Sequence, residues 1–185
     1  AGSFRLGGVG QGGNGALRIA AGKTGGYAGA ITLTGPSLIG GEAAAPLDGT
    51  RLTLSGGIGE DAAGASLSKV GLSTLVLSGA ASNYSGGTFI QAGVVAVQDS
   101  AALGPGSIEV TAGSSLRLEN AALAASSYPQ VKIAGRGVAL SGVDQGALIG
   151  TGNSASYNGR VLLAGNAAVA VGSGERRLGH RVVAA

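Results

Sequence analysis

The chain of 185 residues contains no cysteine, no methionine and no tryptophan. Without cysteine, neither disulfide bonds nor thiolate metal sites can form. Because methionine is missing even at position 1, we expect the sequence to be a processed piece or a window of a longer protein. The only aromatic residues are four tyrosines and two phenylalanines, whereas a single globular core of this size normally uses more large side chains. The scarcity indicates a narrow core filled by Ala, Val, Ile and Leu in repeated layers.

Charge is also sparse, at 11% of the residues with a formal net charge of +3. The one local concentration is Arg176, Arg177, His180 and Arg181. We interpret it as the solvated end of an elongated molecule and expect no nucleic-acid partner. No apolar run approaches the roughly 18–20 residues of a membrane helix, so no transmembrane segment is expected.

Glycine is abundant, with 38 residues, about a fifth of the chain, against roughly 7% in average proteins. Disorder would require few hydrophobic residues and much charge, whereas hydrophobic residues make up 44% here. The glycines are therefore interpreted as corners between strands, where positive φ angles are needed.

The stretch from Lys69 to Gly104 shows the organisation most clearly. Three short apolar runs, Leu75–Leu77, Phe89–Ile90 and Val94–Val97, are each followed by a glycine-bearing corner, with no helix between them. This pattern is typical of a β-solenoid, in which Leu75 and Leu77 would point inward while Val76 points outward. The alternative is a β-sandwich with glycine-rich hairpins, which is disfavoured because no Asn-Gly hairpin joins two alternating runs of matched length.

Short strands are expected on both sides of this stretch. Alternation is clearest in Thr50–Gly56, where Leu52 and Leu54 share one face. The other expected strands are Ala16–Ala20, Ala30–Gly35, Ser66–Val70, Ser107–Thr111, Ser115–Leu118, Gln130–Ile133, Val138–Leu140, Arg160–Leu163 and Ala168–Val171. We expect turns or loops at Gly25–Gly29, Glu42–Asp48 and Ala121–Ser127.

A Tyr-x-Gly motif recurs at Tyr27, Tyr84 and Tyr157, each time just before an apolar strand. The spacings of 57 and 73 residues correspond to about three coils each at roughly 20–25 residues per coil. The same estimate gives roughly eight or nine coils for the whole chain. We expect these tyrosines to be structural, with rings packed across coils and hydroxyls hydrogen-bonded to corners.

Four segments of the central stretch resemble the passenger-associated transport repeat, also called the autotransporter-associated β-strand repeat. They are Lys69–Gly71, Thr74–Gly79, Asn83–Thr88 and Gln91–Val94, and Asp99–Gly104 fits the end of the unit. Weaker units cover residues 15–59 and 135–174. The sequence departs from the family pattern at Leu72-Ser73 and at Phe89. It also departs at Ala81-Ser82, and these two residues look like a short insertion. The resemblance implies an all-β fold, a right-handed parallel β-helix, which we expect to be continuous over residues 1–185. It also implies an exported protein that is displayed on bacterial surfaces.

Candidate sites for chemistry are few, and we predict no catalytic, cofactor-binding or metal-binding residues. The glycine pattern Gly8–Gly13 resembles a dinucleotide-binding loop, but no helix is expected after it, so it is interpreted as a chance match. Gly56–Asp61 resembles a calcium-binding β-roll repeat, yet it stands alone, and Ala63 occupies a position that needs a large hydrophobic residue. A catalytic triad would have to use His180, the only histidine.

The function that follows is structural rather than enzymatic. We expect a secreted or cell-surface β-helical passenger or fibre segment that forms a rigid stalk or filament. Its partners would be further coils of the same chain or other copies, stacked head to tail or laterally. Two alternatives remain: an adhesin or carbohydrate-binding passenger, in which a loop such as Glu42–Asp48 contacts a surface polysaccharide or a host or matrix ligand, and a β-helix hydrolase.

Overall fold

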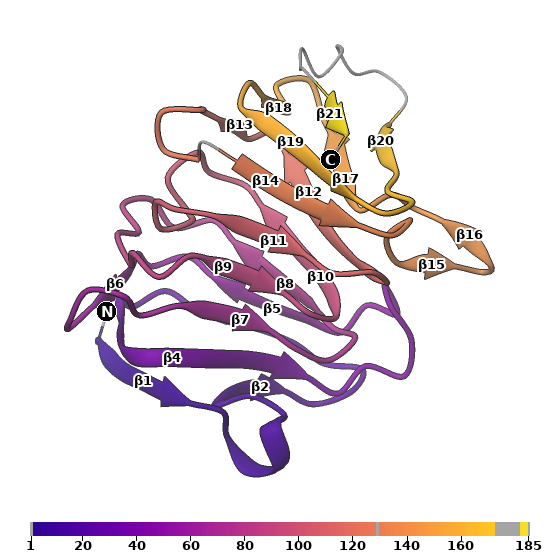
Figure 1. Cartoon of the computed structure of the whole chain (residues 1–185). Coiled ribbons are helices and arrows are strands. Elements are labelled where there is room, and N and C mark those ends of the chain that lie inside the picture. The colour runs from indigo at the N-terminus through magenta and orange to yellow at the C-terminus, as the bar shows by residue number, and fades with distance from the viewer. Residues whose placement is uncertain (1, 129, 173–181, 185) are drawn as a thin grey trace.

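The computed structural model describes residues 2–128 and 130–172, together with the backbone of Val182–Ala184. The chain winds into a parallel β-solenoid of about seven turns, which confirms the all-β, right-handed β-helix prediction (Figure 1). Residue number increases steadily from one end of the solenoid to the other. The one short helix among the described residues is the 3-10 turn η1 (Gln11–Gly13).

Two long parallel sheets face each other across the core. The first sheet contains, in spatial order, β1 (Phe4–Gly8), β4 (Ile31–Gly41), β7 (Leu67–Lys69), β9 (Thr88–Ile90), β11 (Ile108–Val110), β14 (Gln130–Ala134), β19 (Arg160–Ala164) and β21 (Val182–Ala184), with β2 (Leu17–Ile19) and β6 (Ile58–Glu60) also paired to β4. The second sheet contains β3 (Thr24–Tyr27), β5 (Arg51–Leu54), β8 (Thr74–Leu77), β10 (Gly93–Val97), β12 (Ser114–Glu119), β17 (Leu148–Thr151) and β20 (Val169–Val171). Two small sheets join β13 (Ala122–Leu123) to β18 (Ser156–Tyr157) and β15 (Ala139–Leu140) to β16 (Val143–Asp144).

The turns differ in length. Thr88 pairs with Leu67 and with Ile108, so the central turns advance by 21 and 20 residues. Leu116 pairs with Leu148, a step of 32 residues, because this turn carries an inserted segment. Such insertions explain why about seven turns form rather than the eight or nine expected.

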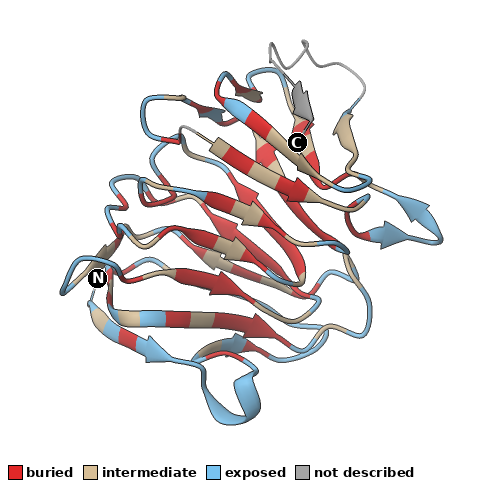
Figure 2. Cartoon of the chain, viewed as in Figure 1, coloured by how far each residue is buried: buried red, intermediate tan, exposed pale blue. Residues whose placement is uncertain are grey.

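Apolar ladders fill the space between the two sheets. Buried residues accordingly recur along the stacked strands (Figure 2). Each inward side chain lies in register with its counterpart in the next coil, so the same position is apolar turn after turn. On the second sheet one ladder runs through Leu52, Leu75, Val95, Leu116 and Leu148, and the next runs through Leu54, Leu77, Val97 and Leu118. At about 25 cal/mol per Å² of apolar area removed from water, these stacked side chains supply the main stabilising term of the fold.

Val76 points outward as predicted, yet it is buried. Its side chain lies outside the core cluster, on the outer face of the second sheet, yet Val76 is 0% exposed. In register it lies between Thr53 and Ala96, and the next residue in this outward row is Arg117. Long side chains from other strands cover this row, as described below.

Two glycine-rich or small-residue segments differ from expectation. Gly25 and Gly26 belong to strand β3 instead of a turn, because backbone pairing with Leu52 and Thr53 needs no side chain. The segment Ala121–Ser127, expected to be a loop, contains the two-residue strand β13.

The strand expected at Val138–Leu140 also takes another form. Val138 is buried against the solenoid, whereas β15 leaves it and pairs with β16 as an antiparallel hairpin. The hairpin projects from the side of the molecule (Figure 1). The expected loop at Glu42–Asp48 is confirmed, since no strand forms between β4 and β5.

Candidate functional site

Lys69 ends strand β7 at a corner that leads from the first sheet to the second. Its side chain is buried, with 1% exposure, and its Nζ donates to the carbonyl oxygens of Val70 at 2.7 Å, Gly71 at 2.6 Å and Ala92 at 3.3 Å. Burial lowers the pKa of this amine to about 7. Because Ala92 belongs to the next coil, the amine joins two consecutive corners and has a structural role.

The opposite corners, which lead from the second sheet back to the first, are held by tyrosine hydroxyls. Tyr157 Oη lies 2.9 Å from the carbonyl oxygen of Tyr128 and 3.1 Å from that of Arg160. Tyr27 Oη donates to the carbonyl oxygen of Gly2 at 2.8 Å. These contacts agree with the structural role predicted for the Tyr-x-Gly motifs.

Tyr84, in the third motif, packs differently. Its hydroxyl lies 2.7 Å from Thr88 Oγ1 within the same corner, and its ring is fully buried. Gly104 of the following coil lies so close that a Cβ there would meet the Tyr84 ring at 2.7 Å. Burial raises the pKa of Tyr84 to about 12, so this phenol stays protonated at physiological pH.

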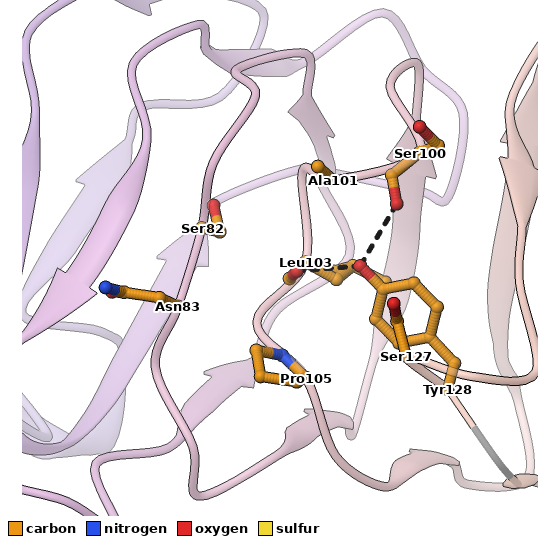
Figure 3. Close-up of a pocket in the computed structure, with 8 residues that line it drawn as sticks. All are labelled: Ser82, Asn83, Ser100, Ala101, Leu103, Pro105, Ser127 and Tyr128. Atoms are coloured by element: carbon orange, nitrogen blue, oxygen red, sulfur yellow. Dashed lines mark hydrogen bonds between the residues drawn. The ribbon is translucent and has the colours of Figure 1, made fainter.

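A hollow of about 260 Å³ lies along three of these corners (Figure 3). Its eight lining residues are uncharged, and two of its hydroxyl groups already have partners within the protein. Tyr128 Oη lies 2.7 Å from the carbonyl oxygen of Leu103 and 3.2 Å from that of Ser100, and Ser82 Oγ accepts a hydrogen bond from Ile58 N. Tyr128 was missed as a corner residue because no glycine follows it two positions later. The hollow is therefore part of the corner framework.

The carboxylates Glu60 and Asp61, considered for calcium, lie in separate contacts. Glu60 accepts a hydrogen bond from Ala65 N at 3.0 Å, and hydrogen bonds from Ser85 are the main cause that lowers its pKa. Asp61 pairs with Arg5 of the first coil. Among residues 2–128 and 130–172, no three His, Cys, Asp or Glu side chains gather as a metal site would require.

The glycine pattern Gly8–Gly13 leads into η1 and then into strand β2, and not into an α-helix. The arrangement lacks the helix N-terminus that holds a pyrophosphate in dinucleotide sites, in agreement with a chance match. The basic cluster with His180 lies outside the described residues.

One charged cluster, which we call the arginine cluster, lies on the outer face of the second sheet: Arg51, Gln98, Arg117 and Glu119. Arg117 Nε lies 2.8 Å from Glu119 Oε1, and Arg51 Nη2 lies 3.7 Å from Glu119 Oε2. Gln98 Nε2 donates to the same Oε2 atom at 2.6 Å. Strands β8 and β10 lie between Arg51 and Glu119, so these side chains cross both strands and cover Val76 and Ala96.

Sequence reasoning missed this cluster. Arg51 and Glu119 are 68 positions apart in the printed sequence, and only the stacking register of four strands brings them together. The available signal was weak: each residue occupies an outward position beside a core leucine, Leu52 or Leu118.

A pocket of about 320 Å³ opens beside the arginine cluster. It is lined by Leu47, Gly49, Thr50, Arg51, Thr74 and Arg117. The loop that forms one wall is held by Asp48, whose carboxylate accepts hydrogen bonds from Ala44 N at 2.9 Å and Thr50 N at 2.8 Å. Bonds from Thr50 are the main cause that lowers the pKa of Asp48.

A second insertion packs on the same face of the second sheet, farther along the solenoid. Ser115 Oγ donates to the carbonyl oxygen of Gly146 at 2.7 Å and accepts from Val138 N at 3.0 Å. The two insertions, at residues 42–49 before β5 and 135–147 before β17, flank strands β8, β10 and β12. We call the outer face between them the flanked face.

Comparison with known proteins identifies one segment. Residues 67–97 match the family model of the passenger-associated-transport-repeat, which confirms the resemblance found in the central stretch. The matched segment spans β7 to β10 and includes Lys69 and Tyr84. No curated protein and no solved structure matches the chain. In the described part of the chain, no helix is both long and apolar enough to cross a membrane.

Proposed function

We propose that this chain is a rigid structural segment of a bacterial passenger-type protein that is displayed on the cell surface or secreted. The passenger-associated-transport repeat and the β-solenoid together support the passenger type. The same repeat supports an exported location and a non-enzymatic role. The continuous backbone ladders support the finer assignment, a stalk or filament segment.

The observation that carries this proposal is the continuity of the backbone ladders. The two long sheets extend through nearly all the described chain, and each coil between the first and the last pairs with the coil before it and the coil after it. Such an object resists bending without any cofactor, because the strands inside each long sheet are hydrogen-bonded on both sides and inward side chains pack on their counterparts in the next coil. A mechanical role needs no further group.

Self-association or continuation of the same chain is part of the proposal. In the first coil, β1 pairs only with β4 and β3 pairs only with β5, so each has one edge without a strand partner among the described residues. Such edges are templates for further strand pairing. Another coil or another copy stacked head to tail would cover them.

Electron microscopy of the native material, without affinity selection, tests the proposal. Regular filaments with an axial repeat near the length of one solenoid would identify a polymerising subunit. Thin stalks or short rods on cell envelopes would identify a passenger segment within a longer chain. Compact globules, or a diffuse distribution in the cell interior, would contradict the proposed function.

A further inference from the structure

The arginine cluster joins coils that are not neighbours. In a solenoid, backbone hydrogen bonds connect each strand only to the strands directly before and after it in the sheet. Arg51 lies in β5 and Glu119 lies in β12, and strands β8 and β10 separate them. Arg51 Nη2 nevertheless lies 3.7 Å from Glu119 Oε2, although their strands are three strand spacings apart, roughly 14 Å. The contact is therefore a connection that the backbone ladders do not provide.

Glu119 is the shared acceptor of the cluster. Besides Arg51, it contacts Arg117 Nε at 2.8 Å and accepts a hydrogen bond from Gln98 Nε2 at 2.6 Å. The side chains of Glu119 and Arg117 are 19% and 20% exposed. An isolated exposed ion pair contributes little to stability, whereas partly buried charges in a network are screened less and hold one geometry. Three side chains from three coils thus meet at one carboxylate.

An apolar layer lies beneath the cluster. Val76 and Ala96 are outward residues of the flanked face, and both are 0% exposed. In the same outward row, Thr53 precedes them and Ile149 follows Arg117, and these two residues are partly exposed. Among the described residues of this row, burial is thus complete only in the two strands that the arginine cluster crosses. Moving the arginine side chains away would expose this apolar surface to water, which is unfavourable.

We propose that the arginine cluster acts as a strap that makes strands β5, β8, β10 and β12 open as one cooperative unit. Nearest-neighbour stacking alone lets a solenoid open coil by coil from its ends. With the strap, β5 separates from β8 only when Arg51 also leaves Glu119 and Val76 is uncovered. The inference goes beyond the proposed mechanical function. It concerns the folded chain alone, so it does not depend on what the rod does.

Native-state hydrogen exchange of the full chain, resolved strand by strand with nuclear magnetic resonance, tests the strap. In the parent chain, we expect the slowest amides of β5 to be as protected as those of β8 and β10. In Glu119→Gln, the amides of β5 should exchange about tenfold faster than in the parent, although the substituted residue lies three strands away. Arg51→Gln should produce the same acceleration in β5, because it removes the other end of the strap.

The distance over which Glu119→Gln acts separates a strap from an ordinary structural contact. If Glu119 supported only its own strand, its substitution would act on the neighbouring strands β10 and β17 and leave β5 unchanged. The strap also predicts that the two substitutions are not additive. In the double variant, exchange in β5 should be no faster than in the faster of the two single variants.

Glu109→Gln is the matched control. It removes a partly exposed carboxylate whose ion pair with Lys132, at 2.7 Å, joins the adjacent strands β11 and β14. Because this pair spans no intervening strand, its loss should leave exchange in β5 unchanged. Far-ultraviolet circular dichroism establishes that every variant is folded.

Three results would overturn the proposal. They are exchange in β5 of Glu119→Gln that equals the parent, additive effects of the two strap substitutions in β5, and an equal acceleration of β5 by Glu109→Gln. None of the three would affect the filament or stalk assignment, which is judged by microscopy alone.

Discussion

Lys69 illustrates what a single residue of the repeat does for the fold. Its amine donates hydrogen bonds to three backbone carbonyl groups at corners of the solenoid, where the chain lies outside the strands. The same burial makes the charged form costly, which is why its pKa falls to about 7. Corner geometry and proton binding are therefore linked at this position.

The linkage predicts a pH dependence of stability. Lys69 has a pKa of about 7 when folded and roughly 10.4 when unfolded, so between these values the unfolded chain holds more protons. The free energy of unfolding should therefore rise with pH from about 7 to about 10, by up to about 1.4 kcal/mol per unit, and level off below pH 7.

Chemical denaturation of the parent chain and of Lys69→Met, followed by circular dichroism at several pH values, measures this effect. The variant should be less stable at pH 9 by about 1–3 kcal/mol, because carbonyl groups lose their donor. The gap between the two chains should narrow as pH falls toward 7. A gap that stays constant across this range would show that Lys69 does not titrate there.

At the scale of elements, the inserted segments leave the ladders intact. Between Val138 and Gln145 the chain forms the hairpin β15–β16, which pairs with no other strand. Its base is already closed, because Gln145 N donates to the carbonyl oxygen of Val138 at 2.9 Å. Leu140 and Val143 are exposed at 44% and 63%, so the hairpin contributes little to the core.

Replacing residues 139–144 by Asn-Gly should therefore leave the fold intact. Asn-Gly forms the tight turn that a two-residue connection requires. We expect the free energy of unfolding to change by less than about 1 kcal/mol, since surface changes away from buried contacts are small. The matched control replaces 114–119, strand β12, with a linker of equal length and should prevent cooperative unfolding. Loss of the parent transition after the hairpin replacement would contradict this account.

At the scale of the whole molecule, the sequence predicted the fold better than the surface. Inward positions such as Leu52, Leu54, Leu75 and Leu77 were predicted correctly, because alternation within one strand decides which face is apolar. The burial of Val76 and the arginine cluster were missed, because both depend on side chains from strands several coils away. Local periodicity contains no information about which coils stack beside each other or where insertions lengthen a turn.

Each coil contacts mainly the coils next to it, and this arrangement predicts how the molecule unfolds. Leu75→Ala in the central ladder should lower the global free energy of unfolding by about 2–5 kcal/mol, since it leaves a cavity between two coils. Leu6→Ala in the first coil, at 6% exposure, should cost less than half of that. This substitution should reduce the protection of backbone amides against hydrogen exchange only in β1, β2 and β3. Equal global losses from both substitutions would show that the solenoid does not behave as a row of nearest-neighbour units.

The tyrosine corners give the solenoid a polarity. Tyr27, Tyr128 and Tyr157 each direct a hydroxyl at a carbonyl oxygen of the preceding coil, at Gly2, Leu103 and Tyr128. A cut between two such coils would leave donors on one new face and acceptors on the other. Two severed pieces could restore these bonds only by joining end to end in the same orientation as before. The two ends of the rod therefore differ, and a neighbour in the reversed orientation could not form these hydrogen bonds.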